Sequence, residues 1–320
     1  MSPDGTAVVI TTHQRLERLG PLLDRVLDDP GSTEVVVVAD GCGDGTDDYL
    51  LSRAAREPRL RPLLLHPNVG QPRARAAGVR AASYELVLSL DDDVMPDPGL
   101  ASRHAMRHRC GDVDVVLGYM PTYVPKPRRR GQFATNEYAE EYERTALQWE
   151  DSPDDVLPYF WGGNFSVRRD RFLAAVDGYD FPLRYHEDAE LGLRLRELGC
   201  RAVFDRGLRA VHEHSRGWHA YLEEARSAGA GRVLLARSWP HDRPYDALEL
   251  LALATPPVRM VALLCRKEPW HSVTMALLKA AVTVAGPLGW WSVEDKTSRL
   301  AKLLEGHRAV RRATAALSPG

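Results

Sequence analysis

The chain has 320 residues, 44% of them hydrophobic, so it can bury the core of one large domain or of one domain with an appendage. Its 42 Lys and Arg and 44 Asp and Glu residues give a formal net charge of −2, which excludes the global basic field typical of nucleic-acid binding. The four cysteines form no zinc-like spacing, so we expect reduced thiols in a cytosolic protein. The N-terminus enters an apolar strand pattern directly, and no signal peptide is expected.

Strand and helix patterns alternate through the first hundred residues. The predicted strands, apolar and rich in β-branched residues, are 7–12, 34–41, 60–66 and 84–93. The predicted helices, which are amphipathic, are 16–29, 46–56 and 74–83. Continuous apolar strands between helices indicate a parallel sheet covered on both faces. Ligands of such sheets bind at the carboxyl ends of the strands, where this chain has TTHQR, ADGCGDGT, HPNVGQPRAR and SLDDD.

Beyond residue 100 the pattern is less regular. One further strand is predicted at 113–120, a basic loop at 126–131 and an amphipathic helix at 136–150. We interpret the loop as a solvated turn, with contact to a diphosphate or an acidic acceptor as the alternative. Residues 160–215 are dense in polar motifs, and helical patterns dominate after about residue 216.

An apolar segment at 272–293 is the candidate for membrane contact. Lys279, Pro287 and two glycines interrupt it, which argues against a membrane span. A packed helix and turn is expected, and interfacial contact with a membrane or a partner is the alternative. Any peripheral contact with the inner face of a membrane is therefore expected through these C-terminal helices.

Asp91, Asp92 and Asp93 end the fourth predicted strand, where adjacent carboxylates repel one another. Three explanations are open: a solvated turn, a calcium loop, and a divalent cation held by one or two carboxylates together with substrate phosphates. The calcium loop is disfavoured because the EF-hand spacing is absent. In an extended strand end, Asp91 and Asp93 point the same way and Asp92 points opposite. A cation shared by Asp91 and Asp93 would relieve the repulsion.

The motifs AVVITTHQR, VVVVADGCGDGT, NVGQPRARAAGVRAA and LVLSLDDDVMPDP resemble the nucleotide-sugar half of a family 2 glycosyltransferase with the GT-A fold. Further on, FWGGNFSVRR, VDGYDFPLRYHEDAELGLRLRELG and AVHEHS resemble the acceptor half. The fold class implied is α/β, a Rossmann-like and mostly parallel sheet flanked by helices. The implied domains are a GT-A catalytic domain at 1–216, with a nucleotide-sugar half at 1–120 and an acceptor half at 121–216, and a helical C-terminal extension at 217–320.

The resemblance implies inverting transfer from a nucleotide-diphosphate sugar, with a UDP-sugar as the expected donor, to a hydroxyl acceptor. The donor-side residues that it implies are Thr11, Asp40, Arg73, Arg75, Asp91 and Asp92. Thr11 and Asp40 would hold the base, and Arg75, with Arg73 as the alternative, would contact the base or ribose. The chain departs from the family pattern at Ala39 and at the pair His13-Gln14.

The resemblance also implies a divalent cation, Mg²⁺ or Mn²⁺, held by Asp91 and Asp93, with Asp93 as the more direct ligand. His212 matches a further metal ligand in some relatives, and His214 could equally fill that role. An imidazole ligand would favour manganese over magnesium. The alternative for both histidines is a hydrogen-bonded position at the end of a strand.

On the acceptor side, Asp188 matches the general base, and Glu187 could hydrogen-bond the acceptor. The other residues expected to line this side are Trp161, Gly162, Gly163, Asn164 and His186. The alternative for residues 186–188 is simple capping of a helix.

Two alternative functions fit the sequence less well. A sugar-phosphate nucleotidyltransferase would carry a Gly-rich basic loop after its first strand, which TTHQRLERLG is not. A non-catalytic nucleotide-sugar-binding module would not need both a metal pair and a separate acid.

Overall fold

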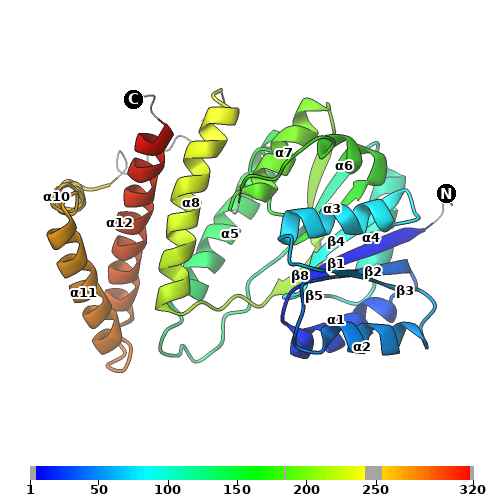
Figure 1. Cartoon of the computed structure of the whole chain (residues 1–320), viewed down its shortest axis with the longest axis horizontal. Coiled ribbons are helices and arrows are strands. Elements are labelled where there is room, and N and C mark those ends of the chain that lie inside the picture. The colour runs from blue at the N-terminus through cyan, green and yellow to red at the C-terminus, as the bar shows by residue number, and fades with distance from the viewer. Residues whose placement is uncertain (1–4, 184, 242–253, 318–320) are drawn as a thin grey trace. The chain divides into compact units, whose positions relative to one another are not determined.

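The computed structural model describes residues 5–183, 185–241 and 254–317. Two compact units divide the chain. Unit 1 comprises Met1–Tyr123, Tyr142–Phe181 and Glu187–Glu213, and unit 2 comprises Val124–Glu141, Pro182–His186 and His214–Gly320. Unit 1 contains a sheet with helices, and unit 2 is helical (Figure 1). The predicted boundary at residue 216 stays a prediction.

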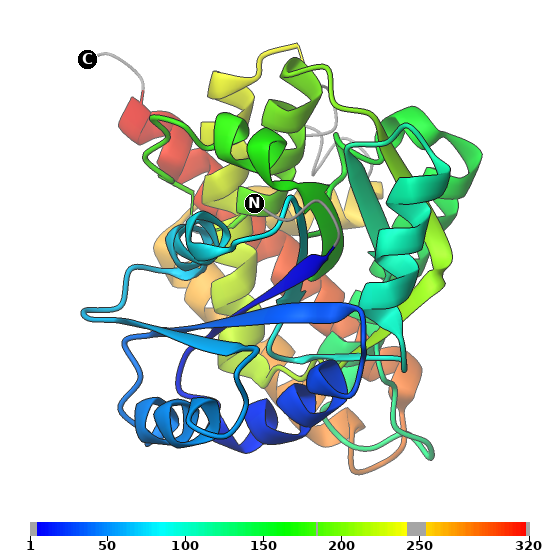
Figure 2. The ribbon, with the colours of Figure 1, turned by 90° about the vertical axis from the view of Figure 1, so that its right-hand side faces the viewer.

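Unit 1 is built on one eight-stranded sheet in the order β3-β2-β1-β4-β7-β6-β8-β5. The strands are β1 (Thr6–Thr12), β2 (Ser32–Asp40), β3 (Leu60–Leu65), β4 (Leu86–Asp91), β5 (Val94–Pro96), β6 (Val115–Tyr119), β7 (Asn164–Arg168) and β8 (Ala202–His212). Neighbours among β1 to β4 run parallel, whereas β7 is antiparallel to both β4 and β6. The sheet is strongly twisted (Figure 2). This architecture confirms the predicted α/β, GT-A-like fold class.

The helices of unit 1 lie between or after its strands along the chain. They are α1 (Leu16–Leu27), α2 (Thr46–Ala54), α3 (Gln71–Ala81), α4 (Leu100–Cys110), the short η1 (Pro153–Asp155), α6 (Arg169–Ala175) and α7 (Glu187–Glu197), together with part of α5 (Phe133–Asp151). Figure 1 shows α1 and α2 on one side of the sheet and α3 on the other. Helix α3 packs so closely that a Cβ on Gly78 would lie 2.5 Å from Val9 and 2.9 Å from Val38. Glycine is therefore required at this crossing.

The core explains why the apolar runs form strands. All seven residues of β1 are buried, as are eight of the nine in β2, because helices cover both faces of the parallel sheet. Strand β7 was not predicted, and β8 was anticipated only at its end, by the alternative that places His212 and His214 at the end of a strand. They lie within the 160–215 block, whose polar motifs mask the strand pattern.

Unit 2 contains α8 (Trp218–Ser238), α10 (Pro256–Leu264), α11 (Glu268–Ala285) and α12 (Trp291–Leu317), with the first part of α5. Helix α12 packs against both α8 and α11 (Figure 1). The segment 272–293 comprises most of α11, a turn and the start of α12, and one side of α11 packs against other helices of unit 2. In the parts of the chain that the structure describes, no helix is both long enough and apolar enough to cross a membrane.

The basic loop at 126–131 is not simply a solvated turn. Within unit 2, Arg128 Nη1 donates to Asp295 Oδ2 at 2.8 Å and Arg128 Nη2 donates to Glu294 Oε2 at 2.9 Å. Its guanidinium carbon also lies 4.9 Å from the centre of the Trp291 ring. Arg128 therefore fastens the loop to the start of α12.

Two buried histidines share one hydroxyl in the core of unit 1. His104 Nδ1 and His108 Nε2 each lie 2.8 Å from Ser166 Oγ, and His104 Nε2 lies 3.2 Å from Asn164 Oδ1. Burial lowers the pKa of His104 to about 3 and that of His108 to about 4. Both rings are therefore neutral in the folded protein near pH 7.

Acidification should destabilise the fold through these histidines. Their pKa values are lower when folded, so the unfolded chain binds more protons, and stability present above pH 6.5 is lost as the pH falls toward 4. The loss at pH 5 should be about 2 kcal/mol per histidine. Urea unfolding at pH 7.5, 6 and 5 measures it. A His104→Gln variant should show a shallower pH dependence, and an unchanged slope would contradict this assignment.

Candidate active site

The carboxyl ends of β1, β2 and β4 lie side by side because these strands are parallel neighbours. The register pairs Thr11 with Asp91 across β1 and β4, and Thr12 with Ala39 across β1 and β2. Asp40 ends β2 one residue later. Three residues predicted from separate motifs, Thr11, Asp40 and Asp91, therefore share one edge of the sheet.

Asp40 organises the loop that leads into α3. Its Oδ1 accepts from the Val69 N–H at 2.7 Å and its Oδ2 from the Gly70 N–H at 2.8 Å. Its backbone carbonyl accepts from Asn68 Nδ2 at 2.9 Å. Gly70 has a φ of +88°, a conformation that glycine adopts without strain. Both carboxylate oxygens thus orient this loop, and base binding by Asp40 stays a prediction.

The two candidate arginines of α3 have different environments. Arg73 is exposed and donates through Nη2 to the carbonyl and to Oδ1 of Asp180, at 2.7 and 3.1 Å. Arg75, in the same helix, is only 2% exposed. Arg73 is therefore the more accessible of the two to a ligand.

The predicted alternation of the three aspartates does not hold. Strand β4 ends at Asp91, and the next two residues lie in a turn. Arg15 Nη1 donates to both Asp92 Oδ1 and Asp93 Oδ2, at 2.6 and 2.8 Å. The alternation fails because it assumed an extended chain through residue 93, so Asp92 and Asp93 share a partner that Asp91 does not contact.

The three carboxyl groups also differ in acidity. Burial, with further repulsion from Asp188, raises the pKa of Asp91 to about 6 against the opposing charge of Arg75. Burial raises the pKa of Asp92 as well. Burial alone would raise the pKa of Asp93, but His212 and Arg15 hold it well below its ordinary value. Asp93 is therefore the carboxylate most firmly held in its charged form.

Arg75 connects the predicted metal-side and base-side carboxylates. Its Nη1 donates to Asp188 Oδ1 at 2.6 Å and its Nη2 donates to Asp91 Oδ1 at 3.1 Å. The guanidinium carbon lies 5.7 Å from the centre of the Phe165 ring. One buried cation thereby fixes two acids that are 97 residues apart in sequence.

Asp188 is held from a second side by the glycine pair of the WGGN motif. Its Oδ2 accepts from the Gly162 N–H at 2.9 Å. A Cβ on Gly162 would lie 2.3 Å from Asp188 Oδ1, so a larger residue would displace the carboxylate. Asp188 lies in the first turn of α7, where the helix dipole favours a negative charge.

Glu187, which precedes Asp188, is biased toward its neutral form. Burial and the neighbouring charge of Asp188 raise the pKa of Glu187. A protonated Glu187 could donate a hydrogen bond but could not accept a proton. This difference favours Asp188 over Glu187 as a base.

The remaining residues of the WGGN motif pack against neighbouring parts of unit 1. Trp161 is half-buried and meets Tyr142 edge-on, with ring centres 5.3 Å apart. A Cβ on Gly163 would lie 2.5 Å from Met120 Sδ and 3.3 Å from Asp91 Oδ2. Asn164 is only 1% exposed, and its Nδ2 donates to the Leu208 carbonyl at 2.9 Å. Asn164 therefore supports the sheet, and we propose no acceptor contact for it.

Of the three candidate histidines, His212 belongs to unit 1, whereas His186 and His214 belong to unit 2. In unit 1, His212 Nε2 lies 3.4 Å from Asp93 Oδ1. In unit 2, His214 stacks on Tyr138, with ring centres 4.1 Å apart. Strand β8 ends at His212, and His214 lies beyond it. Burial lowers the pKa of His186, a unit 2 residue, to about 3.

The side chains around Asp93 carry donor atoms of the types that bind divalent cations. Asp91 and Asp93 offer carboxylate oxygens, and His212 offers an imidazole next to Asp93. This donor set suits Mn²⁺ and is acceptable to Mg²⁺. Across residues 5–183, 185–241 and 254–317, no three His, Cys, Asp or Glu side chains already converge as metal ligands.

Two residues at this edge were missed by the sequence analysis. Arg15 bridges Asp92 and Asp93, and Gln71 Nε2 donates to Asp91 Oδ1 at 2.7 Å. Both follow strand ends within the quoted motifs, at TTHQR and HPNVGQPRAR. The signal for both is their position among the polar residues that directly follow a strand.

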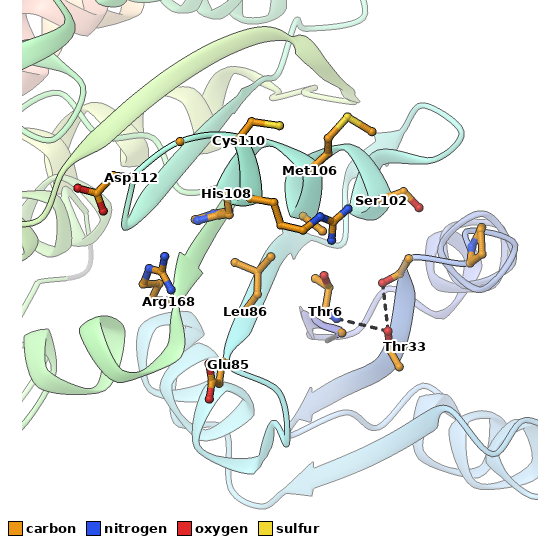
Figure 3. A pocket seen from close by; sticks show the side chains of 16 residues that line it. Thr6, Thr33, Glu85, Leu86, Ser102, Met106, His108, Cys110, Asp112 and Arg168 are labelled. Atoms are coloured by element: carbon orange, nitrogen blue, oxygen red, sulfur yellow. Dashed lines mark hydrogen bonds between the residues drawn. The ribbon is translucent and has the colours of Figure 1, made fainter. Parts of the chain in front are cut away.

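A separate cavity of about 850 Å³ lies at the other, amino-terminal edge of the sheet (Figure 3). It is lined by the first residues of β1 and β4 and by the end of α4, including Thr6, Leu86 and Cys110. None of the predicted site residues lines it.

A sequence profile described as "Glycosyl transferase family 2" matches residues 7–172, slightly more than half of the chain. The match begins in β1 and ends in α6.

Two curated relatives illustrate the similarity. An "N-acetylglucosaminyltransferase" of Sinorhizobium fredii is 25% identical over 283 residues, covering 82% of this chain and 63% of the relative. The "Dolichyl-phosphate beta-glucosyltransferase ALG5C" of Trichomonas vaginalis is 31% identical over 97 residues, or 28% of this chain and 29% of the relative. The chain therefore spans less than two thirds of the length of either relative.

Solved structures share the fold at low sequence identity. The mannosyltransferase PcManGT from Pyrobaculum calidifontis, in complex with GDP-Man and Mn²⁺, has a TM-score of 0.60 and 17% identity over 95% of this chain and 87% of that one. TarS 1–349 from S. aureus, in complex with UDP-GlcNAc, has a TM-score of 0.52 and 15% identity over 98% and 92%.

Proposed function

Because this chain belongs to glycosyl transferase family 2, we propose that it transfers a sugar from a nucleotide-diphosphate donor to an acceptor hydroxyl, with inversion at the anomeric carbon. The bond from that carbon to the diphosphate oxygen breaks while the bond to the acceptor oxygen forms. The acceptor proton goes to Asp188.

The observation that carries the proposal is the position of Arg75 between Asp91 and Asp188. A displacement needs a base on the acceptor side and charge neutralisation on the side of the leaving diphosphate. Close to one another on the same guanidinium, Asp188 can serve as the base and Asp91 can help to hold a cation that would supply the neutralisation. Each carboxylate oxygen of Asp188 has one hydrogen bond from Arg75 or Gly162, which leaves a lone pair for the acceptor hydroxyl.

A divalent cation would be held by Asp91 and Asp93, with His212 as a further ligand. When bound, it would neutralise the charge that develops on the leaving diphosphate. Arg15 holds Asp93, and Arg75 holds Asp91, in fixed orientations for this role.

The donor that we propose to test first is UDP-GlcNAc. Two curated relatives are named N-acetylglucosaminyltransferase, and the TarS structure contains UDP-GlcNAc. GDP-mannose is the comparison donor because the PcManGT structure contains it. We propose an envelope lipid, a polysaccharide or a small natural product as the acceptor.

Product analysis tests the proposal. The full chain should be incubated with UDP-GlcNAc, UDP-glucose or GDP-mannose and a panel of acceptors, with mass spectrometry and NMR of the products. We expect a glycosylated product of inverted configuration and a free nucleoside diphosphate. EDTA should reduce the rate by about 10²-fold or more, and Mg²⁺ or Mn²⁺ should restore it.

Three outcomes would contradict parts of this proposal. Retained configuration would exclude the single displacement, and full activity in a metal-free preparation would exclude the metal role of Asp91 and Asp93. Pyrophosphate release from a nucleoside triphosphate and a sugar phosphate would favour the nucleotidyltransferase alternative.

A further inference from the structure

Helix α11 in unit 2 has two apolar faces, and the residues that the structure describes cover only one of them. The covered face carries Met275, Leu278 and Val282, which contribute to the apolar clusters of unit 2. The other face carries Trp270, Val273, Leu277 and Val284, which are 52–66% exposed. Their spacing of three, four and seven residues places them along one side of the helix. A helix that is apolar on both sides normally has a neighbour on each side.

Exposed apolar side chains continue on both sides of α11 in the chain. Helix α10 packs through Ala262 and Cys265, and leaves Met260, Leu263 and Leu264 more than half exposed. The turn after α11 exposes Leu288 and Trp290, and the first turn of α12 exposes Val293. We call these ten side chains the α10–α11 surface: Met260, Leu263, Leu264, Trp270, Val273, Leu277, Val284, Leu288, Trp290 and Val293. They make up ten of the seventeen large apolar side chains that are exposed in the described residues.

The charge of this segment is strongly basic, unlike that of the whole chain. Between residues 256 and 293 there are four cationic residues, Arg259, Arg266, Lys267 and Lys279, all exposed. The segment has one acid, Glu268, which pairs with Arg308 of α12. The full chain, by contrast, has a net charge of −2. Arg259, Arg266 and Lys267 lie in and just after α10, whereas Lys279 lies on another side of α11 from the exposed face. Basic residues near an apolar helix face are the pattern that binds anionic lipid.

Two tryptophans mark the ends of the exposed α11 face. Trp270 lies in the first turn of α11 and Trp290 lies just beyond its end, and they are 58% and 57% exposed. Indole rings favour the level of the lipid headgroups, where the ring is half in hydrocarbon and its N–H meets water. Figure 1 shows α11 lying along α12, with α10 near its first turn.

We propose that the α10–α11 surface docks this protein onto an anionic lipid bilayer, with α11 lying in the interface and not crossing it. A second copy of the chain fits less well, because a symmetric contact through this surface would bring its four cations against the same four. The docking does not depend on the proposed transfer reaction.

Vesicle sedimentation tests the proposal with the full chain. Phosphatidylcholine vesicles containing 30% phosphatidylglycerol are compared with pure phosphatidylcholine vesicles at low and high salt. We expect about tenfold stronger partitioning onto the anionic vesicles, weakened by 0.5 M NaCl. The variant Trp270→Ser/Leu277→Ser should lose about tenfold or more of this partitioning.

A matched control variant distinguishes the loss of this surface from the loss of any two exposed apolar side chains. Leu51→Ser/Leu198→Ser removes two exposed apolar side chains from unit 1 and should partition like the unmodified chain. Equal losses in both double variants, or no partitioning by the unmodified chain, would overturn the proposal. A concentration-dependent dimer in light scattering that only Trp270→Ser/Leu277→Ser abolishes, without vesicle binding, would assign the surface to a second copy instead.

Discussion

Replacing Asp188 by Asn is expected to reduce the turnover of sugar transfer by about 10³-fold, within the range that a general base contributes. Asparagine has nearly the same shape and can still accept one hydrogen bond, from Arg75 or from the Gly162 N–H. It cannot accept the acceptor proton at neutral pH. Turnover at saturating donor and acceptor measures the loss, and calorimetric titration with the nucleoside diphosphate should show affinity within a few-fold of the unmodified chain.

Two further substitutions make this result interpretable. Asp170→Asn changes an exposed aspartate of α6 in the same way, and it should leave turnover unchanged. Glu187→Gln tests the neighbouring acid, whose raised pKa leaves it largely protonated near pH 7. Normal turnover in Asp188→Asn together with a large loss in Glu187→Gln would transfer the base role to Glu187.

Replacing Arg75 by Lys should lower turnover by about 10²-fold, although the charge is kept. The two terminal nitrogens of Arg75 donate to different carboxylates, Asp188 at 2.6 Å and Asp91 at 3.1 Å. A lysine ammonium is a single point and cannot reproduce the rigid fork that spans both acids. Turnover and urea unfolding should be measured on the same preparations.

Removing the charge altogether should act on stability as well. Arg75→Ala would leave Asp91 and Asp188 without their shared cation, and a broken buried ion pair costs about 3–5 kcal/mol. Arg73→Ala is the matched comparison, because Arg73 pairs with a 94% exposed Asp180 and such pairs contribute little. Equal unfolding free energies for Arg75→Ala and the unmodified chain would contradict the central position of Arg75.

The sequence allowed most of the sheet to be predicted, because buried parallel strands are continuous apolar runs. The runs at 7–12, 34–41 and 60–66 match β1, β2 and β3 within two residues. Strand β7 escaped because it is short and antiparallel and follows a glycine pair. The network of His104, His108 and Ser166 escaped because none of these residues forms a motif with its neighbours in sequence.

The acids of the candidate site could be predicted from the sequence, but the residues that orient them could not. Asp91, Asp93 and Asp188 stand in recognisable motifs, but the partners that orient them do not. The shared contact of Arg15 with Asp92 and Asp93 depends on a turn that begins directly after β4. Strand alternation, a rule for extended chain, could not describe residues 92 and 93.

The sequence by itself determined the family, the order of the early strands and the edge where the polar strand ends meet. These properties are local, since periodicity and strand-end motifs involve residues within about ten positions of one another. The tertiary structure alone decided that Arg75 joins Asp91 to Asp188, that Asp40 holds the loop before α3, and that one apolar face of α11 lacks a cover among the described residues. Such contacts link residues up to 113 positions apart, and packing of the whole chain fixes them.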